Sequence, residues 1–280
     1  MKKILIPTDF SDNAWDAFTY AIRLYEDVAA QFYILHTYHV GSSQMSDRMH
    51  QQRNTKIFRA IEEDTNSEMA KWQAMVNENL DNDKHQFLYL TRLGDLVTNI
   101  NQLVSKKNID LIIMGTAGAT GAKEIFLGSN ATKLIHEISL CPILSIPKDY
   151  EYKDLSRVVL ATDLKKPLDI NQLNVLIELR QLFNFSVEIV KVSDNKKLSG
   201  EQEQNSKIIE SVFAEKGITL NLIDKKEKSI AKTIQNYTAE HTDLICMVNY
   251  EHSFIERLTN EAIVITSICK SLEDAICPLK

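Results

Sequence analysis

The sequence has no long hydrophobic run and no excess of basic residues. Its longest apolar stretches, such as residues 111–114 and 143–146, are far too short to cross a bilayer. The apolar run near the N-terminus breaks at Pro7 and Asp9, which favours a buried strand over a signal peptide. A net charge of −6 argues against non-specific binding of nucleic acid, which needs a basic surface. We therefore expect neither a membrane protein nor a nucleic-acid-binding protein.

Several familiar chemical motifs are also missing. The four cysteines lie far apart and form no CxxC pair, so they suit small buried residues in a reducing cytoplasm better than disulfides or a zinc site. Neither a P-loop, nor a GxGxxG fingerprint, nor a GxSxG nucleophile elbow occurs. His36 and His39 would point to opposite faces of a strand, so they are not expected to share a metal. Instead, we expect one of them to be a hydrogen-bonded histidine in or near the core.

With 280 residues the chain is about twice the size of a typical domain, which predicts two domains. In the first half, apolar runs alternate with segments of helical periodicity. We expect strands at residues 3–7, 32–38, 87–93, 111–114 and 142–147, and helices at 13–30, 51–80, 95–105 and 129–138. This alternation predicts an open parallel sheet with helices on both faces, which binds ligands beyond the carboxyl ends of its strands.

The second half repeats the first in weakened form. Residues 157–163 (RVVLATD) parallel 3–9 (KILIPTD), residues 243–247 parallel 110–114, and residues 277–278 parallel 141–142. We expect further strands at 187–192 and 219–223, and helices at 201–216 and 229–241. Three matches in the same order predict an internal duplication, with domains at 1–148 and 154–280. Since just two residues follow position 278, the fifth strand of the second copy is expected to be short or missing.

The most informative segment is residues 115–130, GTAGATGAKEIFLGSN, which follows an expected buried strand and precedes an expected helix. Two residues separate Gly115 from Gly118, and nine separate Gly118 from Gly128. Glycine lets the backbone approach a phosphate closely, and the free N–H groups at a helix start favour an anion. The segment fits a polyphosphate site; the alternative interpretation is a tight surface loop.

This segment resembles the G-2x-G-9x-G-(S/T) signature of the ATP-binding branch of the universal stress protein family. Residues 7–11 (PTDFS) are similar to the end of that family's first strand, and residues 110–115 and 141–144 resemble its fourth and fifth strands. The likeness covers residues 1–147 and extends to 150–280 only as a tandem second copy. It implies two Rossmann-like domains of the adenine nucleotide alpha hydrolase-like type, each an open five-stranded, mostly parallel sheet flanked by helices.

The resemblance also implies a nucleotide site for ATP or ADP, with or without Mg2+. The glycine segment would hold ribose and phosphates, Asp9 would accept hydrogen bonds from adenine or ribose, and Thr37 would frame the base through its backbone. The alternative for Asp9 is an N-cap or turn residue before the first helix, and the two roles are compatible. No catalytic or metal-binding residue is expected. The expected ligand contacts are Pro7, Thr8, Asp9, Thr37, Met114, Gly115, Ala117, Gly118, Gly128, Ser129 and Asn130.

The second copy departs from the family pattern. Met247 is followed by Val248 where the first copy has Gly115, and no glycine occurs after Gly217. The second copy keeps Asp163 in the place of Asp9 but not the glycines, so we expect nucleotide in the first copy only.

The resemblance favours a nucleotide-dependent stress-response regulator whose ligand alters protein binding. One alternative is a slow ATPase, for which Lys123, Glu124 and Asn130 are the candidates near the γ-phosphate. Another is a nucleotide-free scaffold. The two copies are expected to pack as an intramolecular pseudo-dimer, with or without a further homodimer.

Overall fold

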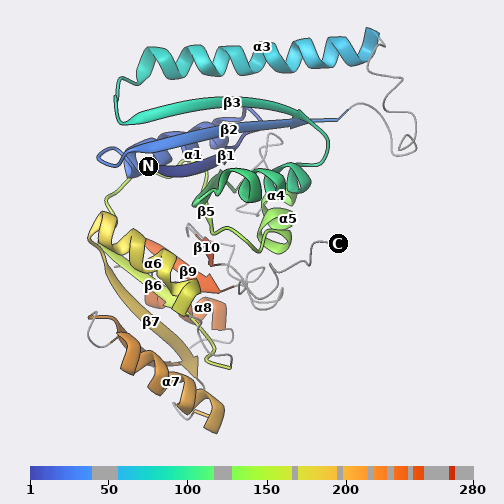
Figure 1. The fold of residues 1–280 in the computed structure, drawn as a ribbon. Coiled ribbons are helices and arrows are strands. Elements are labelled where there is room, and N and C mark those ends of the chain that lie inside the picture. Colours follow the sequence, from blue (N-terminus) through green and yellow to red (C-terminus); the bar gives the residue numbers. More distant parts are fainter. Residues whose placement is uncertain are drawn as a thin grey trace.

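The computed structural model describes residues 1–39, 56–116, 128–165, 170–193, 198–213, 217–225, 230–238, 242–248 and 265–268. Strands and helices alternate along the chain (Figure 1). The strands are β1 (Lys2–Pro7), β2 (Ala30–Tyr38), β3 (His85–Leu93), β4 (Leu111–Gly115), β5 (Ile143–Ile146), β6 (Arg157–Ala161), β7 (Ser186–Ser193), β8 (Thr219–Asp224), β9 (Leu244–Val248) and β10 (Ile265–Ile268). The helices are α1 (Asp12–Leu24), α3 (Lys56–Asn79), α4 (Leu96–Lys107), α5 (Ser129–Glu137), α6 (Ile170–Phe183), α7 (Gly200–Phe213) and α8 (Ile230–Thr238). Within these ranges no helix is both long and apolar enough to span a bilayer.

The strands form one sheet in the order β3-β2-β1-β4-β5-β10-β9-β6-β7-β8. The second half repeats the strand order of the first, with β6 to β10 in the places of β1 to β5. Among the described strands, all pairs within a half are parallel, and the antiparallel pair β5–β10, with Leu144 opposite Thr266, joins the halves. The two expected sheets of five strands are therefore joined into a single sheet.

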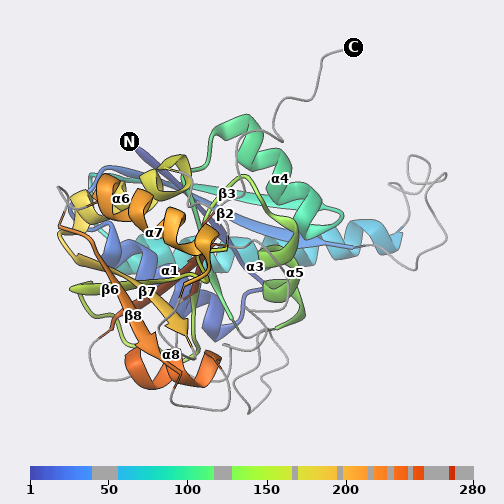
Figure 2. The ribbon, with the colours of Figure 1, turned by 90° about the horizontal axis from the view of Figure 1, so that it is seen from below.

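Helices cover both faces of this sheet, as expected for parallel strands connected by crossovers. Helices α1, α3, α6 and α7 contribute to one buried cluster, and α4, α5 and α8 to the other (Figures 1 and 2). Neighbouring strand residues alternate between the clusters, so Ile4 and Ile6 lie in the first and Leu5 in the second. Each cluster contains residues of both halves, so the core is continuous across the chain.

Aromatic contacts add to the packing between the halves. Tyr25, at the end of α1, packs edge-on against Phe183 of α6 with ring centroids 5.3 Å apart. Tyr20 of α1 packs in the same way against Tyr150 and Tyr152 of the segment that links the halves. Burial, followed by the neighbouring Tyr150 and Tyr152 hydroxyls, raises the pKa of Tyr20 well above its ordinary value. Helix α1 thus contacts the first half, the linking segment and the second half.

A polar cluster in the second half is centred on Glu188, which is buried. The Glu188 carboxylate on β7 accepts hydrogen bonds from Arg157, Asn221 and Tyr237, which lie on β6, β8 and α8. Burial acts to raise the pKa of Glu188, but the hydrogen bonds from Tyr237, Arg157 and Asn221 outweigh it and leave the pKa below its ordinary value. The cluster connects three strands to the helix that covers them, and sequence patterns gave no sign of it.

The expected and observed elements differ in three places. The helix expected at 13–30 ends at Leu24, because the chain turns there and Ala30 already pairs with Lys2 as the start of β2. Helix α6 was not expected at all. The fifth strand of the second half is β10, upstream of the expected position, where it pairs with β5 and β9. Residues 277–278, like residues 51–55 of the expected long helix, lie outside the described ranges.

Candidate functional site

The candidate site lies where the carboxyl ends of β1 and β4 meet. Strand β1 pairs with β2 on one side and with β4 on the other. The chain leaves β1 toward β2 and later returns to β4, so its connections diverge on the two sides of β1. Open parallel sheets bind ligands at this kind of switch point, beyond the carboxyl ends of the strands. Thr8 and Asp9 follow β1 at this edge, and Gly115 ends β4.

A hydrogen-bonded turn follows β1. The Thr8 hydroxyl accepts a hydrogen bond from the Phe10 N–H at 2.9 Å. The Asp9 carboxylate accepts from the Ser11 N–H at 3.1 Å and from its hydroxyl at 2.5 Å. Ser11 in turn is the N-cap of α1 and accepts from the Ala14 N–H at 3.3 Å. Asp9 is therefore a turn residue, as one alternative from the sequence predicted, and the N-cap of α1 is Ser11.

Packing within the protein explains why position 115 is a glycine, independently of any ligand. A β-carbon there would lie 2.5 Å from Asn13 Oδ1, 2.8 Å from Asn13 Cγ and 2.8 Å from the Asn13 backbone oxygen. Asn13 is 3% exposed, and its Nδ2 donates to the Ile146 carbonyl at 3.3 Å. The first turn of α1 thus packs directly on the end of β4. The sequence signal for this contact is Asn13 itself, a polar residue on the buried face of a predicted helix.

The two ends of the glycine segment lie together at the same edge. The Thr116 N–H donates to the Ile146 carbonyl at 3.0 Å, and the Gly128 N–H donates to the Thr116 carbonyl at 2.6 Å. Gly128 is the N-cap of α5, with no side-chain capping hydrogen bond, and Ser129 and Asn130 are exposed in the helix's first turn. Residues 117–127, including the expected contacts Ala117 and Gly118, lie outside the described ranges. The start of α5 is therefore placed beside the end of β4.

An ion pair joins α5 to α4. Asp95 is the N-cap of α4 and accepts from the Thr98 N–H at 3.0 Å, while Lys133 Nζ of α5 lies 2.7 Å from Asp95 Oδ1. The hydrogen bond from Lys133, followed by that from the Thr98 backbone, lowers the pKa of Asp95 to about 2. This pair connects α5, the helix that follows the glycine segment, to the N-terminus of α4.

We expect Asp95→Ala to lower the free energy of unfolding by about 1 kcal/mol, because α4 loses its N-cap. The ion pair adds little, since both side chains are more than two-fifths exposed. Asp95→Asn is the matched control, because it keeps a capping oxygen and should retain most of the stability. Urea denaturation at pH 7 measures both variants, and equal losses in the two would contradict the capping role.

The Asp95 carboxylate also makes the stability of the fold depend on pH. The pKa of Asp95 is lowered in the folded chain, so its contribution to stability is present above the unfolded pKa of about 4 and is lost as pH falls toward 2. The stability difference between wild type and Asp95→Ala should therefore shrink on acidification, which urea denaturation at a series of pH values measures.

The other expected contacts differ in exposure. Pro7 is buried at the end of β1, and Thr37 is half-buried on β2, opposite Arg92. Met114 is 5% exposed and packs in the second core cluster, so its side chain serves the core. The structure brings the described members of the predicted site to one edge of the sheet.

The second half contains the same strand-end turn. The Leu164 N–H donates to the Thr162 hydroxyl at 3.1 Å, and the Lys165 N–H donates to the Asp163 carboxylate at 2.9 Å. Leu164 has a φ of 59°, and Phe10 in the first half has 63°. Non-glycine residues seldom adopt this left-handed conformation. Because both halves adopt it, the turn is a feature of the repeated fold.

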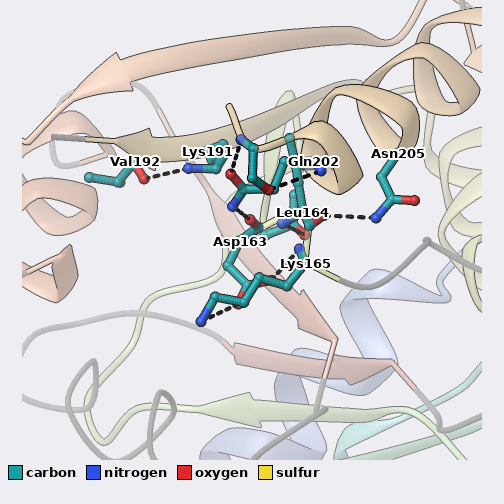
Figure 3. A network of polar contacts seen from close by, with 9 residues as sticks. Asp163, Leu164, Lys165, Lys191, Val192, Gln202 and Asn205 are labelled. Carbon is teal, nitrogen blue, oxygen red and sulfur yellow. Dashed lines mark hydrogen bonds and ion pairs between the residues drawn. The ribbon is translucent and has the colours of Figure 1, made fainter. Parts of the chain in front are cut away.

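Helix α7 contacts the second turn closely (Figure 3). Gln202 Nε2 donates to the Asp163 carbonyl at 2.8 Å, and Asn205 Nδ2 donates to the Leu164 carbonyl at 2.8 Å. Asn205 is buried, and Gln202 also accepts from the Ser199 N–H at 3.0 Å. Side chains of the chain itself thus satisfy two backbone acceptors of the turn in the second half.

Comparison with known proteins places this chain in a family. The sequence profile of the universal stress protein family matches residues 1–147. Universal stress protein MJ0531 of Methanocaldococcus jannaschii is 31% identical over 157 residues, which make up 52% of this chain and 82% of that protein.

Solved structures share the fold over both halves. A universal stress protein from Archaeoglobus fulgidus aligns over 96% of this chain and 98% of its own, with a TM-score of 0.65 and 18% identity. The functionally unknown protein PA1789 from Pseudomonas aeruginosa PAO1 aligns over 96% of this chain and 92% of its own, with a TM-score of 0.56 and 11% identity. The family match over more than half of the chain and the identity with MJ0531 show that the chain belongs to the universal stress protein family.

Proposed function

We propose that the first half binds ATP or ADP at the carboxyl ends of β1 and β4, and that the bound nucleotide regulates association with a protein partner. The observation that carries the proposal is the meeting of two features at one edge of the sheet. The Thr8–Ser11 turn follows β1, and the hydrogen bond between Gly128 and Thr116 brings the start of α5 to the end of β4. A carboxylate and a helix N-terminus at the same edge of the sheet suit the two ends of a nucleotide.

The two features would hold chemically different parts of the ligand. The N-terminus of α5 offers backbone N–H groups and the positive end of the helix dipole, which favour phosphates. Asp9 offers carboxylate oxygens, which accept hydrogen bonds from an adenine amino group or from ribose hydroxyls. Mg2+, when bound with ATP, would neutralise phosphate charge.

The proposal assigns one nucleotide to each chain. The second half retains Asp163 and its turn, but it has no glycine after Gly217. Gln202 and Asn205 donate hydrogen bonds to the backbone of that turn. Without glycines to expose backbone amides, the second half would not offer the phosphate-binding segment on which the proposed site depends.

Calorimetric titration with ATP and ADP, with and without Mg2+, tests the proposal. We expect saturable binding with one nucleotide per chain. Fluorescence offers a second readout, because the chain's two tryptophans, Trp15 and Trp72, pack on each other at 5.2 Å and Trp72 lies 6.2 Å from Phe10 in the candidate site.

The outcomes separate the alternatives. Absence of saturable binding would favour the nucleotide-free scaffold and overturn the proposal. Two equivalent sites per chain would overturn the asymmetry between the halves. Steady release of ADP from bound ATP would instead favour the slow ATPase.

The cytoplasmic location indicated by the cysteines stays a prediction.

A further inference from the structure

His36, on β2, contacts both residues that flank Asp9. Its Nδ1 donates to the Thr8 carbonyl at 2.8 Å, which places the proton on Nδ1. Its ring stacks on the Phe10 ring, with centroids 4.4 Å apart and an interplanar angle of 26°. One side chain thus contacts the residue before Asp9 through a hydrogen bond and the residue after it through ring stacking.

The direction of the Asp9 carboxylate depends on these two neighbours. Phe10 has a φ of 63°, a left-handed conformation that is rare for a bulky side chain and persists where surrounding contacts stabilise it. The Thr8 hydroxyl holds the Phe10 N–H, and His36 holds the Thr8 carbonyl and the Phe10 ring. A change at His36 would therefore alter the backbone that carries Asp9 without removing any group of Asp9 itself.

The second half stabilises its turn in a different way. Lys191 follows Val190 on β7 as His36 follows Leu35 on β2, and its Nζ donates to the Val192 carbonyl at 3.2 Å. There Gln202 and Asn205 of α7 donate hydrogen bonds to backbone carbonyls of the turn (Figure 3). In the first half, which carries the glycine signature, the second strand contacts the turn through His36.

We propose that His36 is a positioning residue for nucleotide binding, which acts by fixing the direction of Asp9. The inference rests on the proposed function, because it assigns Asp9 to the ligand. The Nδ1–H holds the main chain before Asp9, and the imidazole ring supports Phe10 after it. Neither contact involves the nucleotide, so His36 would affect binding indirectly, through the position of Asp9.

Three substitutions separate the two contacts. His36→Asn keeps a side-chain N–H donor and loses the ring, His36→Phe keeps a ring and loses the donor, and His36→Ala loses both. We expect His36→Ala to weaken ATP binding about 5- to 10-fold, the effect of one lost hydrogen bond or ring contact, with partial recovery in the other two. The exposed neighbour His39 provides the control, because His39→Ala should bind as wild type does.

A double-substitution cycle distinguishes positioning from a general loss of structure. In an Asp9→Asn chain, His36→Ala should change ATP affinity less than about twofold, because the group that it positions has lost its charge. Calorimetric titration of the four chains with ATP measures the cycle, and circular dichroism checks folding. If His36→Ala does not fold, the same cycle with His36→Asn and His36→Phe decides.

Each outcome bears on one claim. Wild-type binding with unchanged affinity in the His36 variants would overturn the positioning role and leave the proposed function standing. An equal loss in the wild-type and Asp9→Asn backgrounds would also overturn it. A wild-type chain that binds no adenine nucleotide would overturn the proposed function, and the inference with it.

Discussion

Replacing Gly115 with alanine is expected to lower the free energy of unfolding by about 2–3 kcal/mol, because the added methyl group has no space. It would lie 2.5 Å from Asn13 Oδ1 and 2.8 Å from the Asn13 backbone oxygen. The side chain can rotate away, but the backbone oxygen belongs to the first turn of α1 and can move only with the helix. For a chain of this length the melting temperature should fall by about 2 °C per kcal/mol, which circular dichroism measures.

Gly200 provides the matched control. It begins α7, and a β-carbon there would meet no atom within 4 Å. Gly200→Ala should therefore leave stability unchanged or raise it by up to about 1 kcal/mol, because alanine restricts the unfolded chain. Asn13→Ala in the Gly115→Ala chain should recover part of the loss, since it removes the clashes with the Asn13 side chain and leaves the one with its backbone oxygen. A Gly115→Ala chain as stable as wild type would show that α1 does not require this glycine.

The strand-end turns were predictable because local sequence determines them. The Thr-Asp pairs at 8–9 and 162–163 follow apolar strands, and short polar side chains hydrogen-bond to nearby backbone in such turns. The parallel sheet was predictable for a related reason, since apolar runs alternate with helical periodicity along the chain. Sequence comparison within the chain also identified the repeat, and both halves show the same strand order.

Contacts between distant segments were not predictable in this way. Gly115 was assigned to a phosphate, but its packing partner Asn13 lies on another element, about a hundred residues earlier. The contact of His36 with Thr8 and Phe10 depends on how β1 and β2 align. Strand β10 was not predicted because the Cys-Pro match at 277–278 placed the fifth strand of the second half further along the chain than Ile265–Ile268. In each case tertiary packing, and not local pattern, determines the outcome.

Asp9 and Asp163 allow the proposed asymmetry to be tested with one chemical change at two places. Each follows the first strand of its half, and each accepts a hydrogen bond from the backbone N–H two residues later. Asparagine keeps a side-chain oxygen for that bond, so both substitutions should preserve the turn and the fold. What each removes is the negative charge.

We expect Asp9→Asn to weaken ATP binding about 10- to 100-fold and Asp163→Asn to change it less than about twofold. The reason is that a hydrogen bond to a charged acceptor contributes about 1.5–3 kcal/mol, and in our proposal only Asp9 faces a nucleotide. Calorimetric titration of the two variants and the wild type measures the difference, and matching thermal denaturation confirms intact folds. Equal losses at the two positions would show that both halves take part in binding. An unchanged Asp9→Asn chain would remove the carboxylate from the proposed site.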